Sequence, residues 1–256
     1  MDLGLNGRTA LITGGSRGIG LCTAQLLAAE GCNVHLAARS AMDLEAARRS
    51  ITDVHDVEVT CHAIDISSGD LSKLVEACFD IDILVNNAGA IPRGTVTEID
   101  EKTWREAWDL KVFGFINLIR EMYPLMCRRR HGVIINVIGT AGERPTADSI
   151  AGSMGNASLM ALTRALGSES PTSGVRLVGV NPGPTETERQ LVRWRARAEK
   201  ELGTAERWRE LTTGFPFGRL ATVTEIANMI VFLCSDLSSY TTGTIVTIDG
   251  GSSWRS

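Results

Sequence analysis

A glycine-rich turn between an apolar strand pattern and a helical pattern places the strongest constraint on this chain. The turn reads Thr13-Gly14-Gly15-Ser16-Arg17-Gly18-Ile19-Gly20, with β-forming residues at 9–12 before it and a helical pattern at 19–30 after it. Glycines let the backbone turn sharply and approach a pyrophosphate closely, and N–H groups at a helix start attract an anion. The Gly-x-x-x-Gly-x-Gly spacing is a variant of the dinucleotide-binding pattern, and similar turns also occur without a ligand. The turn predicts a dinucleotide site that other motifs must support.

Strand and helix patterns alternate along the rest of the chain. Strands are expected at 8–13, 33–38, 57–64, 81–86, 132–138, 174–181 and 244–248. Helices are expected at 19–30, 43–52, 71–79, 101–129, 151–168, 186–211 and 224–235. Such βαβ repetition builds an α/β fold with one Rossmann-type, doubly wound parallel sheet and helices on both faces. We expect one domain over residues 1–256.

Composition narrows the class of protein. The net charge of −4 argues against a nucleic acid or an anionic membrane surface as partner. The first residues lack the pattern of a signal peptide, and the six cysteines show no Cys-x-x-Cys pair, as expected for reduced structural thiols. The histidines are dispersed in sequence, so no metal site is expected. A cytoplasmic protein is predicted.

The end of the second strand bears on the choice of nucleotide. An acidic residue there usually holds a 2′-hydroxyl, whereas arginine suits a 2′-phosphate. Here the strand ends Leu36-Ala37-Ala38-Arg39-Ser40, and Arg17 in the glycine turn supplies a second cation. This favours NADP over NAD, and two solvated arginines are the alternative. Asp65 and Ile66 follow the third strand, where the adenine edge is expected.

Taken together, these motifs resemble the short-chain dehydrogenase/reductase family. The resemblance runs from the glycine turn through Asp65, Asn86-Asn87-Ala88-Gly89 and Asn181-Pro182-Gly183-Pro184-Thr185 to Asp249-Gly250-Gly251. It implies a Rossmann-type fold, NAD(P) binding, a homo-oligomer (usually a tetramer) and a segment at about 186–215 that covers a small-molecule substrate. By resemblance, the cofactor-binding residues are Gly14, Ser16, Arg17, Gly18, Ile19, Gly20, Arg39, Asp65, Ile66, Asn86, Ala88, Gly89, Pro182, Gly183 and Thr185.

The positions that carry chemistry in the family depart from its pattern. The family uses a tyrosine as proton donor, a lysine that lowers its pKa, a serine that holds the substrate oxygen and an asparagine that organises a water chain. Ungapped intervals measured from the matching motifs place Gly152, Asn156, Gly139 and Lys111 at these four positions. The chain has only two tyrosines, Tyr123 and Tyr240, and neither lies in the expected helix.

Few residues near these positions carry suitable acid–base chemistry. Lys111 is the best candidate because burial lowers the pKa of an amine toward the working range. The alternative for Lys111 is a structural amine that binds backbone carbonyls. Thr140 offers a hydroxyl but is too weak an acid to replace a tuned tyrosine. Asp148 is either a partner of Lys111, a base or a solvated loop residue.

The covering segment carries four arginines, at positions 189, 193, 195 and 197, which indicate either an acidic substrate or a solvated helix face. Trp194 and Trp208 either pack this segment down or line the pocket. Three functions stay open. The first is an NADP-dependent oxidoreductase that acts on a small carbonyl or hydroxyl compound through a non-standard proton relay. The second is a dinucleotide-binding pseudoenzyme, acting as a sensor or partner subunit. The third is non-redox chemistry in a widened pocket.

Overall fold

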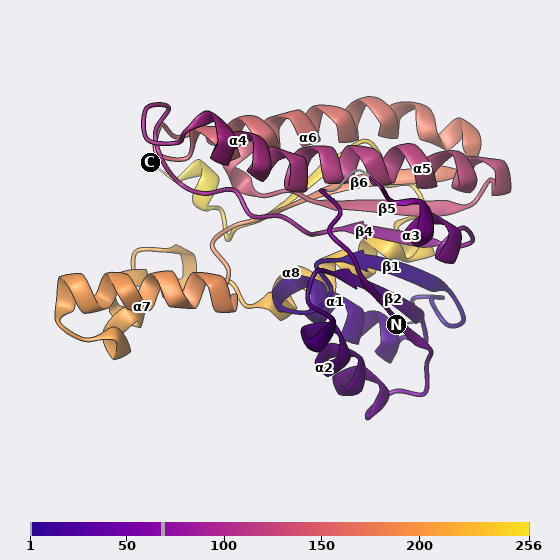
Figure 1. Cartoon of the computed structure of the whole chain (residues 1–256), viewed down its shortest axis with the longest axis horizontal. Coiled ribbons are helices and arrows are strands. Elements are labelled where there is room, and N and C mark those ends of the chain that lie inside the picture. Colours follow the sequence, from indigo (N-terminus) through magenta and orange to yellow (C-terminus); the bar gives the residue numbers. More distant parts are fainter. Residues whose placement is uncertain (1, 68–69, 256) are drawn as a thin grey trace.

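The chain forms a single parallel sheet covered by helices on both faces (Figure 1). The structure is a computed structural model that describes residues 2–67 and 70–255. Its seven strands run in the spatial order β3-β2-β1-β4-β5-β6-β7, and every neighbouring pair is parallel. The strands are β1 (Thr9–Thr13), β2 (Asn33–Ala38), β3 (Val59–Ala63), β4 (Ile83–Asn86), β5 (Gly132–Val137), β6 (Val175–Pro182) and β7 (Ile245–Ile248). The predicted doubly wound fold is confirmed.

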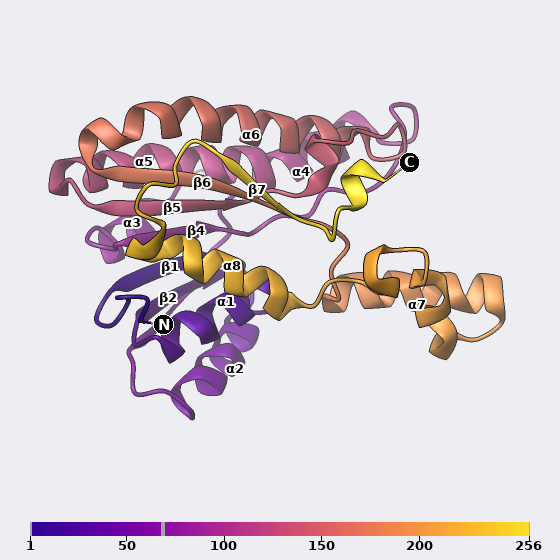
Figure 2. The same cartoon turned by 180° about the vertical axis from the view of Figure 1, so that it is seen from behind.

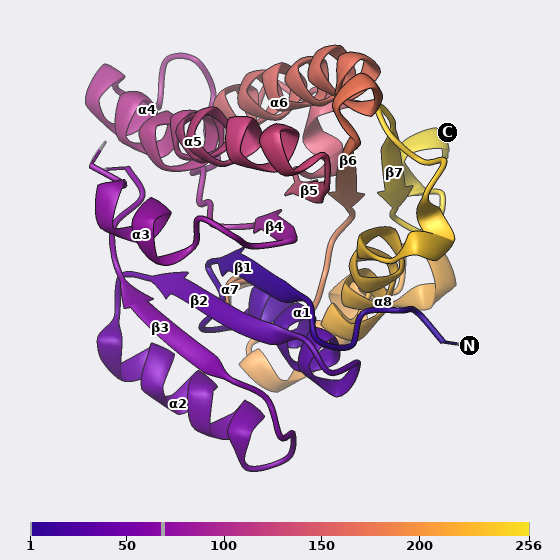
Figure 3. The same ribbon diagram turned by 90° about the vertical axis from the view of Figure 1, so that its right-hand side faces the viewer.

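Helices divide between the two faces of the sheet (Figures 1 and 3). One face carries α1 (Gly18–Ala29), α2 (Ala41–Thr52) and α8 (Val223–Cys234). The other carries α3 (Ser72–Ala77), α4 (Glu101–Trp108), α5 (Gly114–Arg129) and α6 (Ile150–Glu169). A separate buried apolar cluster lies against each face, because parallel strands covered on both sides bury alternate side chains in opposite directions.

The strand order reverses between β1 and β4. Chain connections from these two strands leave in opposite directions, so the carboxyl ends of β1 and β4 flank a crevice. In open α/β sheets this crevice is where ligands bind. The glycine turn after β1 and the Asn86–Gly89 motif after β4 both lie at this edge, as the sequence predicts.

The long helix predicted at 101–129 is continuous, but it contains one π-type turn. Residues Asp109–Phe113 form a π-type turn between α4 and α5. Such an insertion rotates the side chains on either side of it, and these bulges often occur at functional sites. Lys111 lies within this turn.

The segment after β6 projects from the body as a helical hairpin (Figures 1 and 2). It consists of α7 (Glu188–Leu202) and a 3₁₀ segment, Ala205–Thr212. Its own small apolar cluster is built on Ala198, Trp208 and Leu220, and Trp194 meets Phe215 edge-on at 5.6 Å. Both tryptophans therefore pack the hairpin, which answers the question the sequence left open. Within the described residues, no helix is long and apolar enough to cross a bilayer.

Candidate active site

The glycine turn adopts backbone conformations that side chains disfavour. Gly14 and Gly18 have φ angles of 64° and 58°. A Cβ at Gly20 would lie 2.3 Å from the Gly14 carbonyl oxygen, so helix α1 packs directly on the turn. These positions require glycine, and they bring the backbone to the mouth of the crevice.

The two loops that flank the crevice are tied together by side chains. The Thr13 hydroxyl accepts hydrogen bonds from the backbone N–H groups of Asn87 (2.9 Å) and Ala88 (3.0 Å). The Asn87 amide in turn donates to the Thr13 carbonyl at 3.0 Å. Sequence reasoning did not assign Thr13 and Asn87 to the site, although a polar residue that ends a buried strand is a visible signal.

The start of α1 lies at the crevice and is uncapped, a property it shares with α3, α5 and α6. No side chain caps it, and its first turn holds no acidic residue. By contrast, α2, α4, α7 and α8 each have a side-chain cap and an acidic residue in the first turn. The free N–H groups and positive dipole end of α1 suit an anion such as a pyrophosphate, so the residues present fit a dinucleotide.

Cations surround this anion-binding position. Exposed Arg17 pairs with Asp43 at 3.1 Å, and Arg39 follows β2 directly. Arg189, in the first turn of α7, donates to the Gly89 carbonyl at 3.0 Å. Partial desolvation, followed by the positive charges of Arg193, Arg17 and Arg39, lowers the pKa of Arg189. Of the arginines predicted either to meet an acidic substrate or to be solvated, Arg189 faces the crevice, whereas Arg197 pairs with Glu201 at 2.7 Å.

Lys111 reaches the carboxyl end of β5. Its ammonium donates to the carbonyls of Val137 (2.9 Å) and Ile138 (3.0 Å) and lies 5.2 Å from the centre of the Phe115 ring. Its stem crosses Gly89, where a Cβ would lie 2.2 Å from the lysine Cδ. Burial, together with the charge of Arg189, lowers the pKa of Lys111 to about 8. A partly buried amine that titrates near neutrality lies beside the predicted cofactor loop.

The positions that would hold the other three family residues lie close to Lys111. Gly139 has a φ of 124°, and its carbonyl accepts a hydrogen bond from the Asn156 amide at 3.3 Å. At Gly152, a Cβ would lie 3.2 Å from the Ser149 hydroxyl oxygen and 3.8 Å from a methyl group of Ile91. Thr140 opens a short 3₁₀ turn after Gly139. Their assignment to the family's functional positions stays a prediction.

A buried amide pair supports β4 and β5 beneath this region. The Asn86 amide donates to the Asn136 side-chain oxygen at 3.0 Å, and the Asn136 amide donates to the Thr163 hydroxyl at 3.0 Å. The side-chain oxygen of Asn86 is buried and has no hydrogen-bond partner within the described residues. Sequence reasoning did not find Asn136, whose neighbours give no distinguishing pattern.

The remaining predicted binding residues line the ends of β3 and β6. Asp65 accepts hydrogen bonds from the backbone and hydroxyl of Ser67, which lower its pKa, and Ile66 is buried. The Thr185 hydroxyl donates to the Gly183 carbonyl at 2.9 Å. Pro182 ends β6, and the following backbone runs along β7 through the Gly183 N–H and the Ile248 carbonyl. These residues share the carboxyl edge of the sheet.

The structure favours one of the alternatives for Asp148 and corrects the expectation for the histidines. Asp148 is exposed; it accepts a hydrogen bond from the Thr146 hydroxyl and lies 3.5 Å from Arg93, so it acts as a solvated loop residue rather than a partner of Lys111. The histidines are not all dispersed: His35 and His62 meet at 2.9 Å, because β2 and β3 are neighbours in the sheet. The contact could not be predicted from the sequence, because the two histidines are 27 positions apart and meet only through strand pairing.

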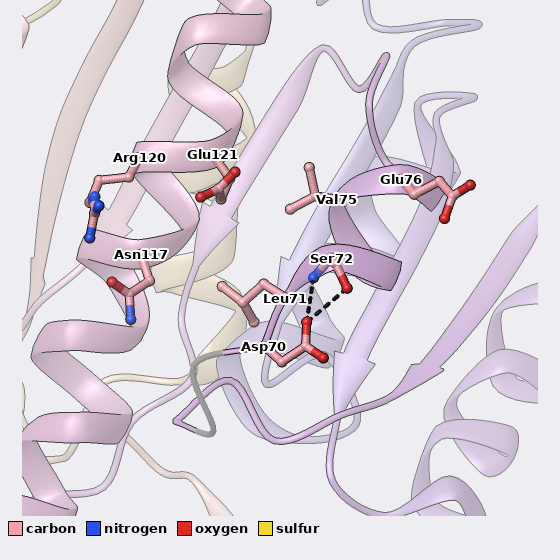
Figure 4. Close-up of a pocket in the computed structure, with 8 residues that line it drawn as sticks. All are labelled: Asp70, Leu71, Ser72, Val75, Glu76, Asn117, Arg120 and Glu121. Carbon is pink, nitrogen blue, oxygen red and sulfur yellow. Dashed lines mark hydrogen bonds between the residues drawn. The ribbon is translucent and has the colours of Figure 1, made fainter.

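A separate hollow lies between α3 and α5 (Figure 4). Polar side chains line most of it, and Asp70 accepts hydrogen bonds from the backbone and hydroxyl of Ser72. None of the predicted site residues lines this hollow.

Comparisons with known proteins agree with this geometry. Residues 14–253 match the family described as Enoyl-(Acyl carrier protein) reductase. A putative ketoacyl reductase of the monensin polyketide synthase from Streptomyces virginiae is 31% identical over 95% of this chain and 96% of its own length. A 3-oxoacyl-[acyl-carrier-protein] reductase from Staphylococcus aureus is 30% identical over 95% of this chain and 97% of its own.

Among solved structures, L-sorbose reductase from Gluconobacter frateurii, complexed with NADPH and L-sorbose, superposes with a TM-score of 0.94. It is 30% identical, and the match covers 100% of both chains. The chain belongs to the short-chain dehydrogenase/reductase family of oxidoreductases.

Proposed function

We propose that the protein is an NADP-dependent oxidoreductase that reduces a small carbonyl compound, or oxidises the corresponding alcohol, with Lys111 as the proton-transfer group. The observation that carries the proposal is the Lys111 ammonium, partly buried, with a pKa lowered to about 8. A proton donor works best when its pKa lies near the working pH. Two of its N–H groups bind backbone carbonyls, which leaves the third for a substrate oxygen.

The site's own residues have distinct roles in this proposal. The uncapped start of α1 would hold the pyrophosphate, and Arg17 and Arg39 would hold the 2′-phosphate. The nicotinamide, when bound, would supply the hydride for the carbonyl carbon. Lys111 gives its proton to the carbonyl oxygen, becomes a neutral amine and regains a proton from solvent. The support for NADP is the pair of arginines together with the absence of an acid at residues 36–40.

The test is a single-turnover measurement of NADPH oxidation over a panel of carbonyl compounds. Turnover is expected with at least one compound and falls as the pH rises through about 8, where Lys111 loses its proton. Lys111→Met lowers the hydride-transfer rate by roughly 10²- to 10⁴-fold, the range of a lost acid–base group. The control is Lys102→Met, because Lys102 lies on the exposed side of α4 beside Glu106. Equal rates for Lys111→Met and the wild type rule out this role.

Cofactor preference has its own measurement. Calorimetry of Arg39→Ala is expected to show NADPH binding weakened by about 10- to 100-fold, with NADH binding little changed, since a hydrogen bond to a charged group contributes about 1.5–3 kcal/mol. Arg49→Ala is the matched control, because Arg49 is exposed and pairs with Glu45 on α2. Equal losses for both nucleotides contradict an NADP preference.

A second candidate function rests on a specific observation. The Lys111 ammonium already binds two carbonyls, and Asn156 binds a third, so this region also fits a purely structural polar cluster. A dinucleotide-binding pseudoenzyme, acting as a sensor or a partner subunit, is the corresponding proposal. Tight NADPH binding without hydride transfer to any compound of the panel supports it, and turnover that depends on Lys111 eliminates it.

We also propose that the protein is a cytoplasmic homo-oligomer, a tetramer or a dimer. Helices α5 and α6 lie side by side on one outer face (Figures 1 and 3). Phe113, in the π-type turn just before α5, and Met154, on α6, are exposed. Exposed apolar side chains on neighbouring helices fit a surface that meets a second copy. Light scattering of the purified protein measures the assembly, and a monomer at micromolar concentration contradicts it.

A further inference from the structure

Three metal-ligand side chains converge at the edge of the sheet. His35 comes from β2, His62 from edge strand β3, and Cys78 follows the last turn of α3. In the β2–β3 register His62 lies opposite Ala37, two residues beyond His35, so both rings project from the same face of the sheet, beneath α3. None of the three belongs to the predicted cofactor site.

The distances between their ligand atoms are short. Nδ1 of His35 lies 2.9 Å from Nε2 of His62, and the Cys78 sulfur lies 3.3 Å and 3.8 Å from these two nitrogens. The two rings are stacked, with planes 7° apart. Zn–N bonds of about 2.0–2.1 Å and a Zn–S bond of about 2.3 Å require nitrogen and sulfur separations of roughly 3.3–3.6 Å in a tetrahedral site. Moving the imidazoles apart by a few tenths of an ångström, and turning the rings so that both nitrogen lone pairs point at one ion, meets this requirement.

The protonation states favour ligation by the histidines. Burial lowers the pKa of both His35 and His62, so both imidazoles are neutral near pH 7 and keep a lone pair. Without a cation, burial raises the pKa of the Cys78 thiol to about 12. A divalent ion reverses this preference, because a coordinating thiol is deprotonated outright. Asp80 and Glu58 both raise the pKa of His35, so the local field attracts a cation.

We propose that His35, His62 and Cys78 form a metal site of the zinc class, with water in the fourth position. Binding releases one proton, from the Cys78 thiol, as the metal–sulfur bond forms. Cys78 is buried and the two histidines are partly buried, which leaves an approach from solvent on the histidine side. Without metal, the same three side chains form a hydrogen-bonded trio in which one imidazole donates to the other. The proposal does not depend on the oxidoreductase function.

The first experiment titrates the reduced, metal-free protein with Co²⁺ alone. One equivalent is expected to produce a thiolate-to-cobalt charge-transfer band and the intense visible bands of four-coordinate Co²⁺, and Zn²⁺ is expected to remove both. Cys78→Ser abolishes the charge-transfer band. His62→Ala is expected to weaken Co²⁺ binding by at least about 100-fold. Losing a residue that only supports a metal ligand already costs up to roughly 100-fold in affinity, and His62 is itself a proposed ligand.

Matched controls come from nearby residues that are outside the trio. Cys61→Ser keeps the band, because the Cys61 thiol is directed instead at the Leu44 carbonyl at 3.5 Å. His55→Ala keeps the affinity, because His55 lies in the loop before β3. A band that is absent from the wild type, or that survives Cys78→Ser and disappears in Cys61→Ser, overturns the proposal.

A second measurement avoids the risk that a variant fails to fold. X-ray absorption of the zinc-loaded wild-type protein is expected to show one sulfur at about 2.3 Å and nitrogen or oxygen ligands at about 2.0–2.1 Å. A shell of nitrogen and oxygen alone overturns the site. NADPH binding measured on the same samples is expected to be equal with and without zinc, so failure here is distinct from failure of the proposed function.

Discussion

Gly139, which the sequence predicts at the family's serine position, has a backbone conformation that favours glycine. Its φ of 124° and ψ of 149° lie where L-residues are strained, and a Cβ there would meet the Asn156 amide nitrogen at 3.2 Å. A serine therefore does not fit at this position without a backbone shift. On the predicted assignment, introducing tyrosine at 152 and lysine at 156 would still leave position 139 without a serine, so these two changes alone are not expected to supply the family's chemistry.

The strain at Gly139 gives a stability prediction. Gly139→Ala is expected to lower the free energy of unfolding by about 1–3 kcal/mol, the usual cost of a side chain in a sparsely populated backbone region. Gly214→Ala is the control, because Gly214 is exposed, lacks a positive φ and has no atom within 4 Å of the place where a Cβ would lie. Urea unfolding of the two variants measures the difference. Equal stability shows that the backbone at 139 relaxes freely.

Lys111 gives a pH-dependent prediction. Its pKa is lowered from 10.5 to about 8 in the folded protein, so between these values the unfolded chain binds more protons than the folded one. Stability then rises with pH in this window, by at most about 1.4 kcal/mol per pH unit. We expect the unfolding free energy of the wild type, relative to Lys111→Met, to increase from pH 8 to pH 10. A constant difference across this range refutes the depressed pKa.

At the residue scale, sequence reasoning located loops better than contacts. The glycine turn, Arg39 and Lys111 all lie at the carboxyl edge of the sheet. Their positions could be predicted because each belongs to a motif that is local in sequence. The His35–His62 contact and the Thr13–Asn87 tie join residues far apart in the chain. Only strand pairing brings such residues together, and the sequence pattern does not specify which side chains then touch.

At the scale of elements, the apolar periodicity predicts the strands of the sheet and the helices that cover it, and most differences lie at ends and irregular turns. The exception is the helix predicted at 186–211, which ends at Leu202; after Gly203 the chain folds back as the 3₁₀ segment Ala205–Thr212. The helix predicted at 71–79 is shorter, at Ser72–Ala77, and the strand predicted at 57–64 shortens to Val59–Ala63. The π-type turn in the 101–129 helix is not evident from the sequence, because hydrophobic patterning averages over such an insertion. Lys111 lies in that turn, from which its ammonium reaches the carbonyls of Val137 and Ile138. The turn therefore affects the geometry of the candidate site.

Helix α8 illustrates an end that the sequence does define. The Thr222 hydroxyl accepts from the Glu225 N–H at 3.2 Å, and the Glu225 carboxylate accepts from the Thr222 N–H at 2.8 Å, which forms a capping box. Thr222→Ala is expected to cost about 1 kcal/mol of stability, measured by thermal unfolding. Thr222→Ser, which keeps the hydroxyl, is the control. A loss shared equally by both variants assigns the effect to the threonine methyl group instead.

At the scale of the whole molecule, charge is distributed unevenly. The chain carries a net charge of −4, yet Arg17, Arg39, Arg189 and Lys111 gather around one crevice. Burial is the main cause that lowers the pKa values of Arg189 and Lys111, and repulsion from neighbouring arginines lowers both further. An anionic nucleotide bound as proposed would relieve this repulsion. Such a local field concentrates an anion although the protein as a whole is acidic.

The contribution of the α7 hairpin to the positive charge around the crevice can be tested. The α7 hairpin extends away from the body in Figure 1, but the residues at its start contact the loops of the site. There Arg189 binds the Gly89 carbonyl, and the Thr187 methyl would lie 3.5 Å from a Cβ at Gly18. The base of the hairpin thus supplies a cation to the crevice, while the remainder of the hairpin packs on itself. Binding of NADPH should therefore depend on salt through residues of two separate parts of the chain.

We expect the NADPH dissociation constant to rise by on the order of ten-fold between low salt and about 0.5 M salt, because ions screen attraction between exposed charges. In Arg189→Ala, binding is weaker at low salt and its salt dependence is shallower, since one of the attracting cations is gone. Arg207→Ala is the control, because Arg207 pairs with Glu210 at 2.7 Å within the hairpin and contributes equally little at every salt concentration. Fluorescence titration of the three proteins provides the comparison. Parallel salt curves for Arg189→Ala and the wild type would show that the hairpin does not contribute to the field, and the cofactor would then be held by the body of the sheet alone.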